Sequence, residues 1–268
     1  MEGLKKGFQI EFGSFSTNHL VDYHMTHVEP LFNLAPKKRL LNFESDFSQN
    51  SNSSFSKNYS LNRTSFPRGE IGFSNGVNTN FLSVQNHAEY ISNLSGGYNV
   101  NYTHNATHGL FTDLYEARCN INKVTTEPSR VVQERWRSFF ARSHPKELCL
   151  EICQSQGAAH VRNALLGMSK NERQRIIILA VAPAVIIPKN LARDVYNIFS
   201  SADDIYLFDR KGWKANKQEA TFLPPYSGAR IKRAIFKHLY WDHNFQSLTY
   251  KDTIQRIITN YINHPYEG

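Results

Sequence analysis

Residues 148–166 read LCLEICQSQGAAHVRNALL and form the most informative part of the chain. An apolar run leads directly into Gln154-Ser155-Gln156-Gly157, and a segment of small and aliphatic residues follows. The run predicts a buried strand and the later segment predicts a helix, so the four residues between them form a sharp turn. The serine therefore lies where a strand ends and a helix begins.

The turn around Ser155 is typical of the nucleophile elbow of the α/β-hydrolase fold, in which a strained turn projects the serine Oγ above the sheet edge. The elbow pattern is Gly-x-Ser-x-Gly, and here Cys153 replaces the first glycine while Gly157 supplies the second. The helix N-terminus would direct its N–H groups toward the serine. We predict Ser155 as the nucleophile and the backbone N–H of Gln156 as one oxyanion donor. The alternatives are that Ser155 only caps the helix, or that Cys153 is the nucleophile.

A second oxyanion donor is expected from the loop after an earlier strand. The segment EIGFSNGVNTNF, residues 70–81, has this order because its apolar strand ends at Asn-Gly before a predicted helix. We predict the backbone N–H of Val77 as the second donor, and the alternative is an ordinary Asn-Gly turn. The supporting residues around the site are predicted to be Asn75, Gly76, Gln154 and Gly157.

The acid of a catalytic triad is expected after the serine and before the histidine in this fold. The strand VYNIFSS ends just before Ala202-Asp203-Asp204, and ligands and catalytic groups gather beyond the carboxyl ends of parallel strands. We predict Asp204 as the acid, with Asp203 and Asp209 as alternatives.

The histidine is expected in a loop before the last helix, and YWDHNFQSLTYKDT places His243 six residues ahead of Thr249. A serine hydroxyl is hardly ionised at neutral pH, so it needs an imidazole base whose tautomer a carboxylate fixes. We predict His243 as this base. His238 is the alternative, although its apolar and basic surroundings favour a structured segment.

Apolar runs alternate with amphipathic stretches along most of the chain, which favours parallel strands joined by helices. We therefore predict an α/β fold, an α/β-hydrolase-like doubly wound, mostly parallel sheet. The predicted strands span residues 70–76, 99–105, 148–155, 175–183 and 195–201, and the predicted helices span residues 80–95, 128–143, 157–169 and 249–262.

The N-terminal part has a different composition. Residues 42–64 contain 12 Asn or Ser among 23 residues and no sustained apolar period, which predicts a solvated linker. We divide the chain into an Asn/Ser-rich, largely disordered segment over residues 1–67 and a globular domain over residues 68–268.

Charge and cysteine usage narrow the class of protein. The net charge is +8 and the pI is about 9.3, but Lys and Arg are scattered, so no nucleic-acid partner is predicted. The three cysteines, at 119, 149 and 153, form no Cys-x-x-Cys pair, which favours a reducing compartment and no structural metal. The histidines of THNATHG lack a third ligand nearby.

No Sec signal peptide or transmembrane segment is expected, because the start of the chain lacks an apolar region and the longest apolar run is interrupted by Pro183. The expected location is the cytoplasm, or outside the cell after export without a Sec signal.

The chain resembles a chlamydial family of uncharacterised proteins known as a domain of unknown function, over about residues 69–263. The stretches that carry the resemblance are FSNGVNTNFLSVQNHAEYISNLSGGYNVNYTHNATHG, ICQSQGAAHVRNALL, LAVAPAVIIP and DHNFQSLTYKDTIQRIITNYI. Family members typically have Cys-His-Ser-Gln-Gly-Ala at the turn, so Gln154 stands here in the histidine position. The family's Asp-His-Ser/Asn-Phe loop supports His243 over His238. The resemblance implies an α/β-hydrolase-like domain in an intracellular bacterium and no known substrate.

The predicted function is that of a serine hydrolase of lipase or esterase type, acting without a cofactor on a small-molecule or lipid ester. The alternative is a catalytically silent hydrolase scaffold that binds a host or bacterial protein, with residues 1–67 as a translocation tail.

Overall fold

A computed structural model describes residues 56–76, 79–105, 126–228 and 242–263, with no side chains described for residues 207 and 208. All of them belong to one compact unit, residues 49–268. Residues 1–55 lie outside the described part, as do the predicted residues Val77 and His238.

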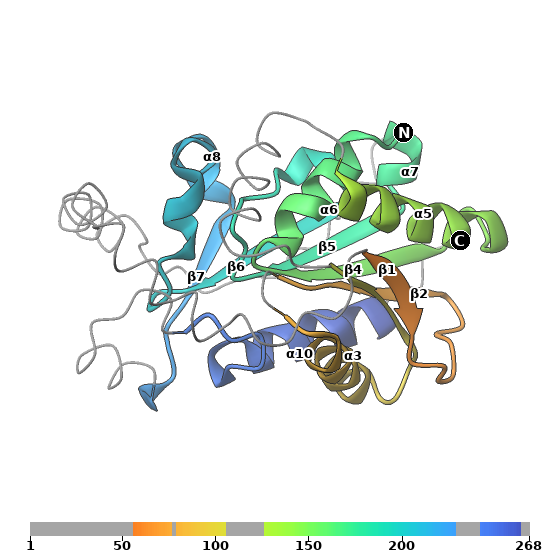
Figure 1. Cartoon of the computed structure of the whole chain (residues 1–268), viewed down its shortest axis with the longest axis horizontal. Helices are drawn as coiled ribbons and strands as arrows, with labels where there is room; N and C mark the ends of the chain where they lie inside the picture. The colour runs from red at the N-terminus through yellow and green to blue at the C-terminus, as the bar shows by residue number, and fades with distance from the viewer. Residues whose placement is uncertain (1–55, 77–78, 106–125, 229–241, 264–268) are drawn as a thin grey trace, which may run out of the picture. The chain divides into compact units, whose positions relative to one another are not determined.

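A seven-stranded sheet forms the centre of the described structure, with the strand order β1-β3-β2-β4-β5-β6-β7 (Figure 1). Only β1 runs antiparallel to its neighbour; the other pairs are parallel. The strands are β1 (Lys57–Ser60), β2 (Gly69–Ser74), β3 (Val100–His104), β4 (Leu148–Gln154), β5 (Ile176–Val181), β6 (Asp194–Ser200) and β7 (Ala220–Leu223).

Helices cover both faces of the sheet, with α5, α6 and α7 on one face and α3 and α10 on the other (Figure 1). Strands covered on both faces need continuous apolar runs, and every residue of β4 and β5 is buried. The predicted α/β-hydrolase-like fold is confirmed. The helices are α3 (Phe81–Leu94), α5 (Glu127–Arg142), α6 (Gly157–Leu166), α7 (Lys170–Arg173), α8 (Arg210–Asn216) and α10 (Leu248–Asn263).

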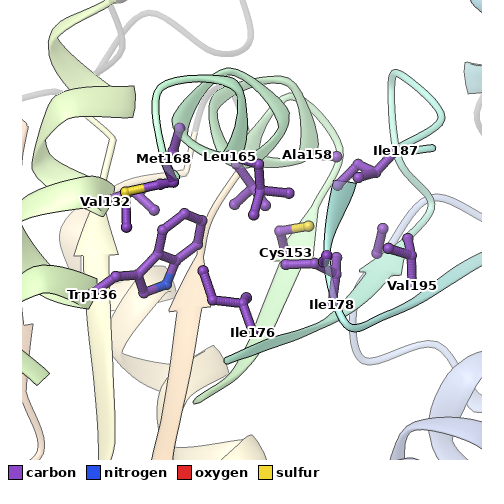
Figure 2. Packing of buried hydrophobic residues seen from close by; sticks show 14 of the residues in the cluster. Val132, Trp136, Cys153, Ala158, Leu165, Met168, Ile176, Ile178, Ile187 and Val195 are labelled. Carbon is purple, nitrogen blue, oxygen red and sulfur yellow. The ribbon is translucent and has the colours of Figure 1, made fainter. Parts of the chain in front are cut away.

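The core under α5 and α6 explains why these helices form where the sequence predicts them. Trp136 of α5, Leu165 of α6 and Ile178 of β5 belong to one buried cluster (Figure 2). On the other face, α10 buries Tyr250, Ile254, Ile257, Ile258 and Tyr261, the residues that its helical periodicity places on one side.

The sequence prediction was wrong at the start of the domain. Residues 57–60 lie in the stretch predicted to be a solvated linker, but they form β1, which pairs with β3. Polar side chains hold this edge strand: Thr103 donates a 2.7 Å hydrogen bond to the Asn58 side chain, which itself donates to the carbonyl of Val131.

The helix α3 packs against the sheet through one face, and Leu82, which lies outside that face, is 68% exposed. The buried residues of α3 are Val84, Ala88, Ile91 and Ser92, because small and β-branched side chains fit closely against the sheet. The strand β7 and the helix α8 were not predicted.

No helix in the described ranges is long and apolar enough to cross a bilayer.

Candidate active site

Ser155 occupies a strained turn between β4 and α6. Its φ angle is 53°, in the left-handed region that residues other than glycine rarely adopt. Two hydrogen bonds to the end of β5 and the residues after it hold the turn: the N–H of Ser155 donates to the carbonyl of Val181 at 3.3 Å, and the carbonyl of Ser155 accepts from the N–H of Ala184 at 3.0 Å. The strand, strained serine and helix have the geometry of a nucleophile elbow.

Gly157 allows the helix to approach the sheet closely after the turn. A Cβ at this position would lie 2.5 Å from the carbonyl oxygen of Ser74 and 2.6 Å from that of Asn75. Both contacts are with backbone, which has little room to move, so the small residue predicted here is required by packing.

The loop after β2 lies directly against the serine. A Cβ at Gly76 would lie 2.7 Å from Cβ of Ser155 and 3.2 Å from its Oγ. The second oxyanion loop was predicted here, and the structure brings this loop and the serine together. Val77, the predicted donor, lies outside the described residues.

Cys153, the alternative nucleophile, is fully buried, and its side chain lies among the apolar residues between β4 and α6 (Figure 2). Burial raises the pKa of its thiol well above the ordinary value, so the reactive thiolate is strongly disfavoured.

His243 is paired with a carboxylate, and the carboxylate is that of Asp203. Nδ1 of His243 lies 2.7 Å from Oδ2 of Asp203, whose side chain is completely buried. Asp204 was predicted in this position, and the carboxylate at Nδ1 of His243 is instead that of its neighbour Asp203. The turn after β6 directs Asp203 inward, because its N–H donates to the carbonyl of Ser200 at 3.1 Å and its Oδ1 accepts from the N–H of Ile205 at 3.0 Å.

The remaining candidate acids occupy other positions. Asp204 is buried at the start of the 3₁₀ segment Ile205–Asp209. Asp209 caps α8 by accepting from the N–H of Gly212 at 2.9 Å, and it lies 3.5 Å from a guanidinium nitrogen of Arg162.

Gln154 connects the elbow to the histidine loop. Its Nε2 donates a 2.9 Å hydrogen bond to the backbone carbonyl of His243. Gln154 was predicted as a supporting residue, but this contact was not predicted, because its partners lie 89 positions apart in the sequence. The three residues of the candidate triad therefore belong to loops that are directly joined.

A buried polar network supports the loop after β2. The side-chain oxygen of Asn75 accepts from the N–H of Asn105 at 2.7 Å, and its amide donates to the carbonyl of Gly76 at 2.7 Å. The amide of Asn105 lies 3.0 Å from Nε2 of His160, which therefore accepts, while Nδ1 lies 3.4 Å from the hydroxyl of Thr126. This network was not predicted. The only indication of it in the sequence was the polar residues Asn75, Asn105 and His160 near the ends of predicted strands and of a predicted helix.

The buried His160 and the partly buried His87 predict a loss of stability in acid. Burial lowers the pKa of His160 to about 4, and it lowers that of His87 to about 4 as well. Below about pH 6.5 the unfolded chain binds protons that the folded protein does not, so the free energy of unfolding falls as the pH drops from 6.5 toward 4. We expect each histidine to contribute on the order of 2 kcal/mol to this loss.

Urea unfolding at pH 7 and at pH 4.5, for the wild type and for His160→Gln, checks this prediction. The variant is less stable at pH 7, but it should lose less stability between the two pH values. An equal loss in both proteins would contradict the assignment of a neutral, buried His160.

The other histidines do not form a metal site in the described ranges. No group of three His, Cys, Asp or Glu side chains there could hold an ion. His104 of the THNATHG segment lies with Nε2 3.3 Å from the carbonyl of Thr79, and His108 is outside the described residues.

Comparisons with known proteins give a family and distant structural neighbours. Residues 48–249 match the family described as "Protein of unknown function (DUF687)". No curated protein matches the chain.

Solved structures that resemble the chain include a Bacillus cereus carboxylesterase, at 12% identity over 82% of this chain and 97% of that one with a TM-score of 0.44. A Trichoderma reesei cutinase in complex with a phosphonate inhibitor is 12% identical over 92% of this chain and 98% of the cutinase chain, with a TM-score of 0.42. Esterase B from Lactobacillus rhamnosis is 11% identical over 92% of this chain and 96% of the esterase chain, with a TM-score of 0.44. Similarity this weak leaves the chemistry to be argued from the chain's own residues.

Proposed function

The chain belongs to the family described as "Protein of unknown function (DUF687)", and we propose that it is a serine hydrolase that cleaves carboxylic esters. Ser155 is the nucleophile, His243 the general base and Asp203 the acid that orients the histidine. The observation that carries the proposal is the His243–Asp203 pair, at 2.7 Å, on a loop that is bonded to the residue preceding the strained serine.

The proposed reaction starts with the attack of Ser155 Oγ on the ester carbonyl. Nδ1 of His243 is committed to Asp203, so Nε2 receives the serine proton and later passes it to the departing alkoxide. The carboxylate of Asp203 fixes the tautomer and stabilises the imidazolium. Water then attacks the acyl-serine with the same histidine as base, which releases the carboxylic acid and restores the serine.

The negative charge of the tetrahedral intermediate requires N–H donors near Ser155. We assign them to the backbone of Gln156, at the N-terminus of the ten-residue helix α6, and to the backbone of Val77. The contact between Gly76 and Ser155 supports the second assignment, because it brings the β2 loop next to the reacting oxygen.

We assign the ester class because ester cleavage makes the fewest demands on the site. An alkoxide leaves far more readily than an unprotonated amide nitrogen and depends less on exact protonation by the histidine, so an elbow serine with an imidazole base suffices.

A fluorophosphonate probe tests the proposal, because it phosphonylates a serine only when the hydroxyl is activated. We expect stoichiometric labelling of the folded protein, mapped by peptide mass spectrometry to Ser155, and none after denaturation. Absence of labelling, or a label on another serine, would favour the alternative of a silent scaffold that acts by binding another protein.

A further inference from the structure

Asp242, the residue before His243, has a carboxylate that is hydrogen-bonded through both oxygens and that the proposed reaction does not use. It is only 2% exposed, and three hydroxyl groups donate to it. Oδ2 accepts from Ser200 at 2.5 Å and from Thr249 at 2.6 Å, and Oδ1 accepts from Ser247. Hydroxyl donors satisfy a buried carboxylate without neutralising it.

These hydroxyls come from both sides of the candidate site. Ser200 is the last residue of β6, and its carbonyl accepts from the N–H of Asp203. Its Oγ also accepts from the N–H of Ala202 at 3.1 Å, inside the turn that carries the acid. Asp242 therefore binds the acid loop at its base.

The other two hydroxyls belong to the segment that follows the histidine. Ser247 and Thr249 lie at the start of α10, and the N–H of Tyr226 donates to the Thr249 hydroxyl at 3.0 Å. The hydrogen bonds of Asp242 therefore join the two ends of the loop that contains His243: Asp242 itself at one end and the first turn of α10 at the other.

Tyr250 provides a parallel bridge between the same two loops. Its hydroxyl donates to the carbonyl of Asp242 at 3.1 Å and accepts from the N–H of Ser200 at 3.0 Å. Burial, followed by the charges of Asp203 and Asp242, raises the pKa of Tyr250 well above its ordinary value, so the bridge is a neutral hydroxyl. Both carboxylates thus lie near one phenol, yet only Asp203 is paired with the His243 ring.

We propose that Asp242 is a positioning residue that holds the acid loop and the histidine loop in register, so that the carboxylate of Asp203 meets Nδ1 of His243. The inference rests on the proposed function for its catalytic consequence. The two carboxylates have separate tasks: Asp203 orients the imidazole, and Asp242 fixes the distance between the two loops. A displacement of about 1 Å in a reacting group can cost roughly 100-fold in rate, which sets the scale of the effect.

The experiment first compares the wild type with two variants by a signal that does not depend on catalysis. A strongly downfield proton resonance from the Nδ1–H of His243 is expected in the wild type, and Asp203→Asn should remove it, which assigns it. We expect Asp242→Asn to broaden or abolish the resonance and to slow fluorophosphonate labelling by about 10- to 100-fold. With p-nitrophenyl acetate as probe, kcat should fall while KM stays within about twofold.

Two further variants complete the test. Thr249→Val removes one of the three hydroxyls and should shift or broaden the resonance with a labelling rate about three- to tenfold lower. It decides the question if Asp242→Asn does not fold. Asp194→Asn, at the opposite end of β6, is the matched control and should leave resonance and labelling unchanged.

An unchanged resonance and labelling rate in folded Asp242→Asn, or in Thr249→Val if the first variant does not fold, would overturn the proposal and leave these residues a role in stability alone. Failure of the proposed function has a different signature. In that case the wild type is not labelled, while the response of the resonance to Asp242→Asn still tests the positioning role.

Discussion

Asp203→Asn is expected to lower kcat for ester hydrolysis by about 10³- to 10⁴-fold, with little change in KM. The asparagine side chain fits the same space, so the fold should survive. An amide directed at Nδ1 of His243 either donates to it or accepts from it without a charge, so it favours the wrong tautomer or leaves the imidazolium unstabilised. Steady-state kinetics with p-nitrophenyl acetate and the rate of fluorophosphonate labelling both measure the loss.

Asp204→Asn separates the two neighbouring carboxylates. We expect this variant to stay within about tenfold of the wild type, because the group that contacts the His243 ring is that of Asp203. Ser155→Ala gives the background rate of hydrolysis in the assay, since this variant lacks the nucleophile itself. Equal losses in Asp203→Asn and Asp204→Asn would contradict the assignment of the acid.

The elbow could be predicted from the sequence because its determinants are local. A buried strand, a serine and a small-residue helix follow one another within residues 148–166, and the close packing of Gly157 on the β2 backbone explains why a small residue stands there. The chain order of serine, acid and histidine then limited the base to the segment before the last helix. His243 was predicted on this ground, and the structure pairs it with a carboxylate.

The choice between Asp203 and Asp204 could not be made from the sequence. Two adjacent residues in a loop point in different directions, and the direction depends on where the turn begins. Here the bonds from the Asp203 N–H to Ser200 and from the Ile205 N–H to Asp203 fix the turn. Such contacts depend on backbone geometry that apolar periodicity does not encode.

The strand β1 was missed for a similar reason. Its sequence, KNYS, is polar and lies in an Asn/Ser-rich stretch, so composition predicted a linker. An edge strand needs only one partner, and β1 is held by its pairing with β3 and by side-chain bonds such as Ser60 to Asn99 at 3.1 Å. Long-range pairing decided this segment, not its hydrophobicity.

A buried ion pair beside the elbow strand carries the second large expected effect. Glu151, in the middle of β4, has no exposed side-chain area and lies 2.6 Å from a guanidinium nitrogen of Arg135 on α5. The same carboxylate accepts from the indole of Trp136 at 3.1 Å and from the hydroxyl of Ser74 at 2.8 Å. Such a pair is satisfied only when every partner is present.

Glu151→Gln is therefore expected to lower the free energy of unfolding by about 3–5 kcal/mol, because it leaves the charge of Arg135 buried without its counter-ion. Adding Arg135→Met to this variant should restore more than about 1 kcal/mol, since an apolar side chain removes the uncompensated charge. Arg137→Gln is the matched control: its ion pair with Glu172 is 3.7 Å long and largely exposed, so its loss should cost at most about 1 kcal/mol. Urea unfolding at pH 7 measures all three, and a Glu151→Gln cost no larger than that of Arg137→Gln would show that β4 tolerates a buried cation.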